Sequence, residues 1–124
     1  MKTVLFVDDH QVLANLSCEI LAMKGYRAVS AYGGEDALRK FDQDNFDILI
    51  TDFRMEGMNG VELARKIHEK HPAVPVIVIT GYGPIEEDKD VAACLQKESL
   101  FPELLDKIAM CLDEGDEPDV AMTA

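Results

Sequence analysis

The sequence predicts an α/β fold, in which helices cover both faces of one doubly wound, five-stranded parallel sheet. Two observations support this prediction. Short apolar runs alternate with helical patterns along the chain. Three of the runs, Thr3–Val7, Ile48–Thr51 and Val76–Ile79, are almost continuously apolar, which is typical of parallel strands buried on both faces. The strand order 2-1-3-4-5 would place these three runs at the centre of the sheet.

The first half of the chain contains two strand–helix pairs. After Thr3–Val7, the segment His10–Lys24 has apolar residues at three- and four-residue spacing and predicts an amphipathic helix that ends before Gly25. We expect one face of this helix to point inward: Val12, Leu13, Leu16, Ile20 and Met23. The less apolar run Arg27–Ala31 predicts an edge strand, and Glu35–Phe41 predicts a second helix.

The middle of the chain repeats this alternation. The strand Ile48–Thr51 leads into Arg54–Gly60, a loop rich in turn-forming residues. The segment Val61–Lys70 predicts a third helix. His68 lies in its last turn and His71 directly follows it; for both we expect a solvated helix end rather than a metal site, because no third ligand is near in sequence.

The pattern is weaker after the strand Val76–Ile79. Glu86–Asp90 predicts at most a turn or two of helix, and Ala93–Gln96 predicts a weak fifth strand. Phe101–Leu112 predicts a clearer final helix. We therefore expect one domain over residues 1–112 and an acidic, disordered tail over 113–124.

Composition excludes several classes of function. The chain has 124 residues, of which 48% are hydrophobic, and its formal net charge is −12. Such an acidic surface disfavours direct binding to nucleic acid or anionic lipid. No apolar run resembles a signal peptide or a membrane span, so we expect a cytoplasmic protein. The three cysteines are far apart and form no C-x-x-C motif, which disfavours a disulfide framework.

Polar residues follow four of the five predicted strands. Their side chains should meet at one edge, because parallel strands end on the same side of a sheet; they are Asp8, Asp9, Asp52, Thr80 and Lys97. Three carboxylates in one cleft require a cation, and their hard oxygens favour Mg²⁺. Asp52 is the best candidate for a nucleophile towards phosphorus, because it leaves a central strand beside the metal.

These residues lie in segments that resemble the receiver domain of two-component response regulators, a family similar to the chemotaxis regulators. The resemblance covers about residues 2–112 and involves the acid pair Asp8-Asp9, "ILITDFRMEGMNGVEL" around Asp52, "VIVITGYG" around Thr80, "MKGYRAVSAYGGEDAL" and Lys97. It implies a flavodoxin-like fold, in which the short spacing from Thr80 to Lys97 predicts a shortened or irregular fourth helix.

The resemblance also implies a mechanism and partners. Asp52 would accept a phosphoryl group from a sensor histidine kinase or a phosphotransfer protein. Asp9, Asp52 and the backbone carbonyl of Arg54 would bind Mg²⁺ directly, with Asp8 acting through water. Thr80 and Lys97 would contact the phosphoryl oxygens. The domain would be a phosphoacceptor that assists its own phosphotransfer and dephosphorylation, rather than an enzyme in the usual sense.

The phosphoryl state would then switch contacts with a downstream effector protein or domain. Whether the phosphorylated domain forms a dimer is left open. Arg54 and Tyr82 occupy positions that tune dephosphorylation in the family.

Four departures from the family pattern affect the far side of the cleft. The spacing from Thr80 to Lys97 is shorter than usual, Glu98 replaces the usual proline after the lysine, and Cys94 stands where the family has a switch aromatic. Glu56 also replaces a loop proline. We therefore expect Glu86–Asp90 to be short or mobile and the coupling to output to be altered.

Two alternative functions remain open at this stage. The first is a degenerate receiver-like binding module whose phosphorylation no longer drives output. The second is a Mg²⁺-dependent phosphohydrolase, which would need an acid two residues after Asp52, where Arg54 stands instead. A flavin-binding domain is disfavoured because Asp8-Asp9 would repel a phosphate.

Overall fold

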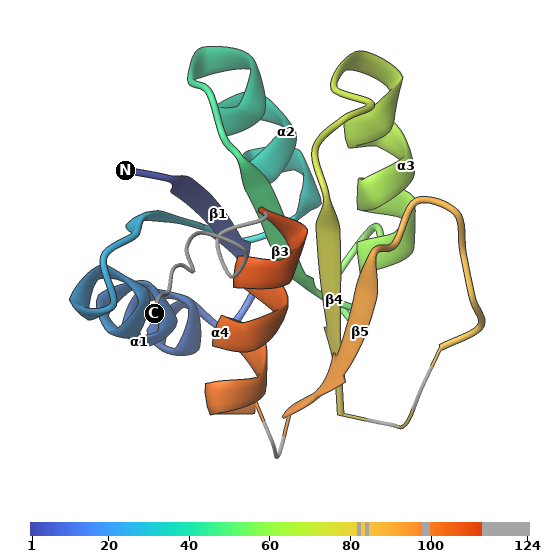
Figure 1. The fold of residues 1–124 in the computed structure, drawn as a ribbon. Helices are drawn as coiled ribbons and strands as arrows, with labels where there is room; N and C mark the ends of the chain where they lie inside the picture. Colours follow the sequence, from blue (N-terminus) through green and yellow to red (C-terminus); the bar gives the residue numbers. More distant parts are fainter. Residues whose placement is uncertain (82, 84, 98–99, 113–124) are drawn as a thin grey trace.

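The sheet confirms the predicted doubly wound topology. The structure is a computed structural model that describes residues 1–81, 83, 85–97 and 100–112. Its five parallel strands are ordered β2-β1-β3-β4-β5 (Figure 1). The strands are β1 (Thr3–Val7), β2 (Arg27–Ala31), β3 (Ile48–Asp52), β4 (Val76–Thr80) and β5 (Ala93–Gln96). The described helices are α1 (Gln11–Met23), α2 (Gly34–Gln43), α3 (Gly60–Lys70) and α4 (Leu100–Cys111). The predicted tail over residues 113–124 lies outside the described residues.

Each face of the sheet packs against its own pair of helices. Every residue of β1, β3 and β4 is buried, because alternate side chains of these strands enter opposite clusters. Leu5 and Val7 of β1 join the cluster that includes residues of α2 and α3. Val4 and Phe6 join the cluster on the other face, with residues of α1 and α4. None of the described helices is long and apolar enough to cross a membrane.

The orientation predicted for α1 was wrong. Val12, Leu13, Leu16 and Met23 are 68%, 43%, 50% and 83% exposed, respectively. The buried residues of α1 are instead Ala14, Ser17 and Leu21, with Cys18 packed against the same cluster. This second set has the same three- and four-residue spacing as the predicted set, so periodicity alone cannot choose between them. The structure buries the face with smaller residues and leaves large apolar side chains on the surface.

The connection between β4 and β5 takes the place of a helix. The turn or two of helix expected at most near Glu86–Asp90 does not form, and the described residues between these strands contain only bends and a turn. Figure 1 shows the connection arching outward from the end of β4 and returning to the start of β5. The connection is short for a crossover between parallel strands. Once the chain has run back along the sheet to the start of β5, too few residues are left to form a helix.

Ion pairs with α3 hold the connection. The His68 ring contacts the Asp90 carboxylate through Nδ1 at 2.7 Å and the Val74 carbonyl oxygen through Nε2 at 2.7 Å. Both partners can accept a hydrogen bond from the ring. Arg65 adds a contact to Asp88 at 3.2 Å. The expected solvated end for His68 was wrong, since this side chain is only 18% exposed.

The same contacts set the charge state of Asp90. The hydrogen bond from His68 lowers the pKa of Asp90, against the opposing effect of burial. The backbone N–H of Asp90 also donates to the Asp88 carboxylate at 2.9 Å, which ties the turn to itself. The connection is therefore anchored by buried charge rather than by a helical hydrogen-bond ladder.

We predict that Asp90→Asn lowers the free energy of unfolding at pH 7 by about 1–2 kcal/mol, because a buried charge-assisted hydrogen bond is weakened. A lowered carboxyl pKa in the folded state stabilises the fold above the ordinary carboxyl range and loses this effect as pH falls through the lowered pKa. The difference between variant and wild type should therefore shrink in acid. Urea unfolding from pH 7 to pH 3 measures it.

Asp42→Asn is the control, because Asp42 forms an exposed ion pair with Lys70 at 3.6 Å, and such pairs contribute about 0–1 kcal/mol. A loss at Asp90 that is no larger than this control, or that is independent of pH, would contradict the anchoring role.

Candidate functional site

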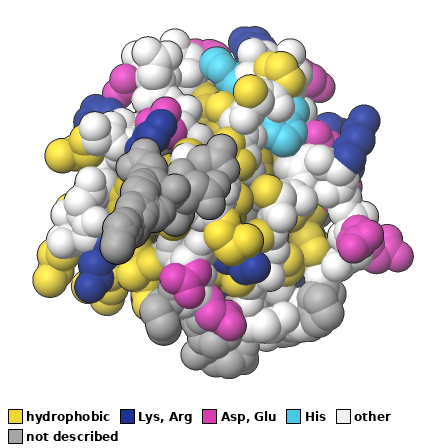
Figure 2. Space-filling view, viewed as in Figure 1, with side chains coloured by type: hydrophobic (Ala, Val, Ile, Leu, Met, Phe, Trp, Pro, Cys, Tyr) yellow, Lys and Arg dark blue, Asp and Glu magenta, His cyan; other side chains and the backbone are white. Residues whose placement is uncertain are grey.

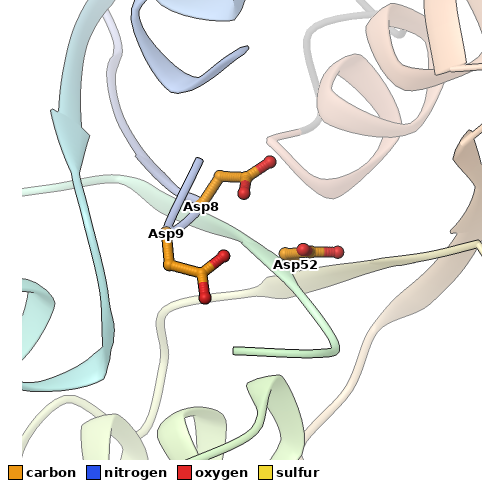
Figure 3. A group of neighbouring side chains, drawn as sticks. All are labelled: Asp8, Asp9 and Asp52. Carbon is orange, nitrogen blue, oxygen red and sulfur yellow. The ribbon is translucent and has the colours of Figure 1, made fainter. Parts of the chain in front are cut away.

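The polar residues predicted at the strand ends meet at one edge of the sheet. Asp8 and Asp9 follow β1, Asp52 ends β3, Thr80 ends β4 and Lys97 follows β5. The parallel register sets Asp52 opposite Ile79, the residue before Thr80. Figure 3 shows the three acidic side chains next to one another, two from the end of β1 and one from the end of β3.

The three carboxylates form a group with metal-ligating geometry. Each of Asp8, Asp9 and Asp52 offers an oxygen, and these oxygens all lie within 4.8 Å of one another. Asp8 and Asp52 are only 5% and 6% exposed, whereas Asp9 is at the surface. Two nearly buried acids and one exposed acid of the same charge repel one another unless a cation lies between them.

Backbone donors orient the first two acids. The N–H of His10, the N-cap residue of α1, donates to Asp8 Oδ1 at 2.9 Å. The N–H of Glu56 donates to Asp9 Oδ2 at 3.2 Å. The N–H of Asp8 itself extends the pairing with β2 by donating to the Ala31 carbonyl at 3.0 Å. Asp9 therefore joins the β1–α1 turn to the loop that follows β3.

Close packing holds the segment after Asp52. The Phe53 N–H donates to the Ile79 carbonyl at 2.7 Å, and the Gly60 N–H donates to the Phe53 carbonyl at 2.9 Å. A Cβ on Gly60 would lie 2.6 Å from the Asp52 carbonyl oxygen, so only glycine allows α3 to begin this close to the acid. Asn59 and Glu62 form a reciprocal capping box at that helix start.

Lys97 and Thr80 complete the edge. The Lys97 ammonium lies 3.3 Å from Asp52 Oδ2, although this lysine side chain is 43% exposed. Thr80 is 2% exposed. Arg54 lines a shallow depression of about 450 Å³ together with Asp9 and Asn59. Tyr82 and Glu98, to which the sequence also drew attention, lie outside the described residues.

Burial and charge oppose ionisation of Asp52. Burial raises the pKa of the Asp52 carboxyl, and the Asp8 carboxylate raises it further. The Lys97 ammonium acts in the opposite direction, and the Asp9 carboxylate again raises the pKa by a smaller effect. One lysine therefore does not compensate three carboxylates. A divalent cation fits this donor set, because hard carboxylate oxygens suit Mg²⁺.

Sequence reasoning missed the cavity beside Asp52. A space of about 210 Å³ is lined by Asp8, Asp52 and Lys97 together with Phe6, Leu13, Ser17 and Ile79. Ser17 reaches it because α1 turns its small-residue face to the sheet, and the partly exposed Leu13 lines the same space from the edge of the helix. The sequence pattern did not reveal this orientation of α1. The packing of Gly60 was also missed, since "NG" at this position was interpreted only as part of a turn.

Comparison with known proteins agrees with this geometry. The family model described as the response regulator receiver domain matches residues 4–108. The transcriptional regulatory protein GlrR of Escherichia coli K12 is 36% identical over 84 residues, which are 68% of this chain and 19% of GlrR. The chain thus spans about a fifth of the length of that curated relative.

Solved structures give the same result. The response regulator TrrA of Thermotoga maritima, crystallised in complex with Mg²⁺–BeF, has a TM-score of 0.82 and 34% identity, covering 90% of this chain and 100% of TrrA. TrrA in complex with the histidine kinase ThkA matches with a TM-score of 0.81 and 34% identity, covering 90% of this chain and 99% of TrrA. With the family model matching most of its length, this chain belongs to the receiver domains of two-component response regulators.

Proposed function

We propose that Asp52 accepts a phosphoryl group from a phosphohistidine in a Mg²⁺-dependent reaction, and that the phosphoryl state switches contacts with a downstream effector protein or domain. The observation that carries this proposal is the nearly buried Asp52 carboxylate, in metal-ligating reach of two other acids and 3.3 Å from a lysine ammonium. The TrrA complexes with Mg²⁺–BeF and with a histidine kinase support it.

The chemistry is an in-line displacement at phosphorus. An Asp52 carboxylate oxygen attacks the phosphorus atom as the P–N bond to the donor imidazole breaks, and the bonding electron pair leaves with the imidazole nitrogen. The Lys97 ammonium and the Thr80 hydroxyl would hold the phosphoryl oxygens on the far side of the site. Asp8, Asp9, Asp52 and the Arg54 carbonyl would hold Mg²⁺, which neutralises charge on the transferring oxygens.

The exposed face of α1 is the proposed docking surface for the phosphodonor. Val12, Leu13 and Leu16, here called the α1 apolar stripe, are exposed. Leu13 also lines the cavity that reaches Asp52, so a protein seated on the stripe would lie beside the phosphoacceptor. Figure 2 shows hydrophobic side chains on the lower left of the molecule, where α1 lies. Exposed apolar patches of this kind mark interaction sites.

We predict that wild type becomes phosphorylated once when incubated with acetyl phosphate and Mg²⁺, and that Asp52→Asn does not. Intact-mass spectrometry measures both. Lys97→Met should slow labelling on the order of 100-fold, because one donor to the developing charge is lost. Asp106→Asn, at an exposed residue of α4, should label like wild type. Equal labelling of Asp52→Asn would refute the assignment of the nucleophile.

We predict that metal-free Asp52→Asn melts at a higher temperature than metal-free wild type at pH 7. The raised carboxyl pKa means that the folded state binds a proton more readily than the unfolded chain, so ionised Asp52 destabilises the fold at neutral pH. This difference should shrink as pH falls through the raised pKa.

Mg²⁺ should have the opposite effect, because it should raise the stability of wild type more than that of Asp52→Asn. At ~100 times its dissociation constant, Mg²⁺ should stabilise wild type by about 2.7 kcal/mol and Asp52→Asn by much less. Differential scanning calorimetry with and without Mg²⁺ tests both statements, with Asp106→Asn as the control. An equal response of wild type and Asp52→Asn to Mg²⁺ would contradict the proposed metal site.

We predict that Leu16→Lys slows phosphotransfer from any autophosphorylated histidine kinase that labels wild type by about tenfold, as expected for a loss of ~1.4 kcal/mol at an interface. Labelling by acetyl phosphate should be unchanged, because this small donor needs no docking surface. Met110→Lys is the matched control, since Met110 is 66% exposed on α4. If Leu16→Lys slows labelling by the kinase and by acetyl phosphate equally, Leu16 acts on the site itself, and the proposed docking surface is wrong.

A further inference from the structure

A groove lies between β5 and the connection that precedes it. It has a volume of about 530 Å³ and runs between the residues around Ile85 and the start of β5 at Ala93 and Cys94. The described residues of the connection form no helix that could fill it. In Figure 1 the connection arches away from β5 on the right of the molecule.

The groove combines an apolar lining with an acidic rim. Ile85, Val91 and Cys94 line it, and the first two also pack against the core cluster of that face. Glu86, Glu87 and Lys89 lie on the rim and are exposed, next to Asp88, so the rim is acidic on balance although it includes one lysine. Among the described residues neither glutamate forms an ion pair. Figure 2 shows acidic side chains at the right of the molecule, over the connection.

The outer wall of the groove is anchored before any partner binds. Asp90 contacts His68 at 2.7 Å, and Asp88 contacts Arg65 at 3.2 Å. The N–H of Ala92 donates to the Val76 carbonyl at 2.8 Å, which ties the end of the wall to β4. A preformed groove spares a partner the entropic cost of ordering the connection.

We propose that this groove binds a positively charged amphipathic segment of another protein. Apolar side chains of the segment enter between Val91 and Cys94, and its Lys or Arg side chains lie over Glu86 and Glu87. The charge of the rim favours a cationic ligand. A second copy of this chain is disfavoured as occupant, because each copy carries a formal net charge of −12. This inference goes beyond the proposed phosphotransfer and does not depend on it.

The probe is a synthetic helical peptide with leucine on one face and lysine on the other. Its control is the same peptide with glutamate in place of lysine. Chemical-shift changes in ¹⁵N spectra should cluster at residues 85–94 with the lysine peptide only. The same result is expected with Asp52→Asn, so that failure of phosphotransfer and failure of groove binding remain distinguishable. Shifts centred on α1 or on the three acids would overturn the proposal.

Two variants separate the groove from general attraction to an acidic protein. Glu86→Lys/Glu87→Lys should raise the dissociation constant at least ~10-fold, since two opposed charges become repulsive. Glu35→Lys/Glu69→Lys changes the net charge equally at exposed residues elsewhere and should have an effect of less than about threefold. An equal loss in both double variants would refute the proposal.

Cys94→Phe tests the apolar lining. The larger ring should occupy the groove and abolish binding of the lysine peptide while the far-ultraviolet circular dichroism stays that of the wild type. If the spectrum changes, Cys94→Leu replaces it as the variant. Undiminished binding by a folded variant would overturn the proposal. So would sedimentation showing a dimer that protects residues 85–94, because the occupant would then be a second copy.

Discussion

Three carboxylates at one edge of the sheet repel one another, and the rest of the structure has to hold them together against this repulsion. Asp8 and Asp52 are nearly buried, and burial together with the charge of Asp8 raises the pKa of Asp52. The fold tolerates this arrangement through a few compensating contacts: a lysine ammonium at Asp52, and backbone N–H groups at Asp8 and Asp9. A cluster of acids that is electrostatically incomplete in this way favours a divalent cation, and the proposed phosphotransfer to Asp52 depends on that cation.

The rest of the domain keeps those acids in position. The three central strands are buried on both faces, so their ends cannot shift without exposing apolar residues on one side or the other. On the α3 side, Gly60 lets the helix start directly against the Asp52 carbonyl. On the α1 side, small residues bring the helix close to the sheet and leave the α1 apolar stripe outside, beside the cavity at Asp52.

The far edge of the sheet is built differently. Ion pairs from α3 to Asp88 and Asp90 hold the connection between β4 and β5, where the described residues form no helix. Cys94 therefore faces a groove rather than a covering helix. The cluster of three acids and the groove beside β5 thus have separate supports: the central strands hold the first, and the ion pairs from α3 hold the second.

Sequence alone determined the topology and the candidate site. Strands that are apolar throughout require cover on both faces, and parallel strands end at one edge, so Asp8, Asp9, Asp52, Thr80 and Lys97 could be grouped without coordinates. Tertiary structure decided the features for which the local sequence pattern allows more than one answer. Two stripes of equal spacing exist on α1, and only packing against the sheet selects the one with Ala14 and Ser17. The pairing of His68 with Asp90 joins residues distant in sequence, and no local signal records a contact that only the folded chain creates.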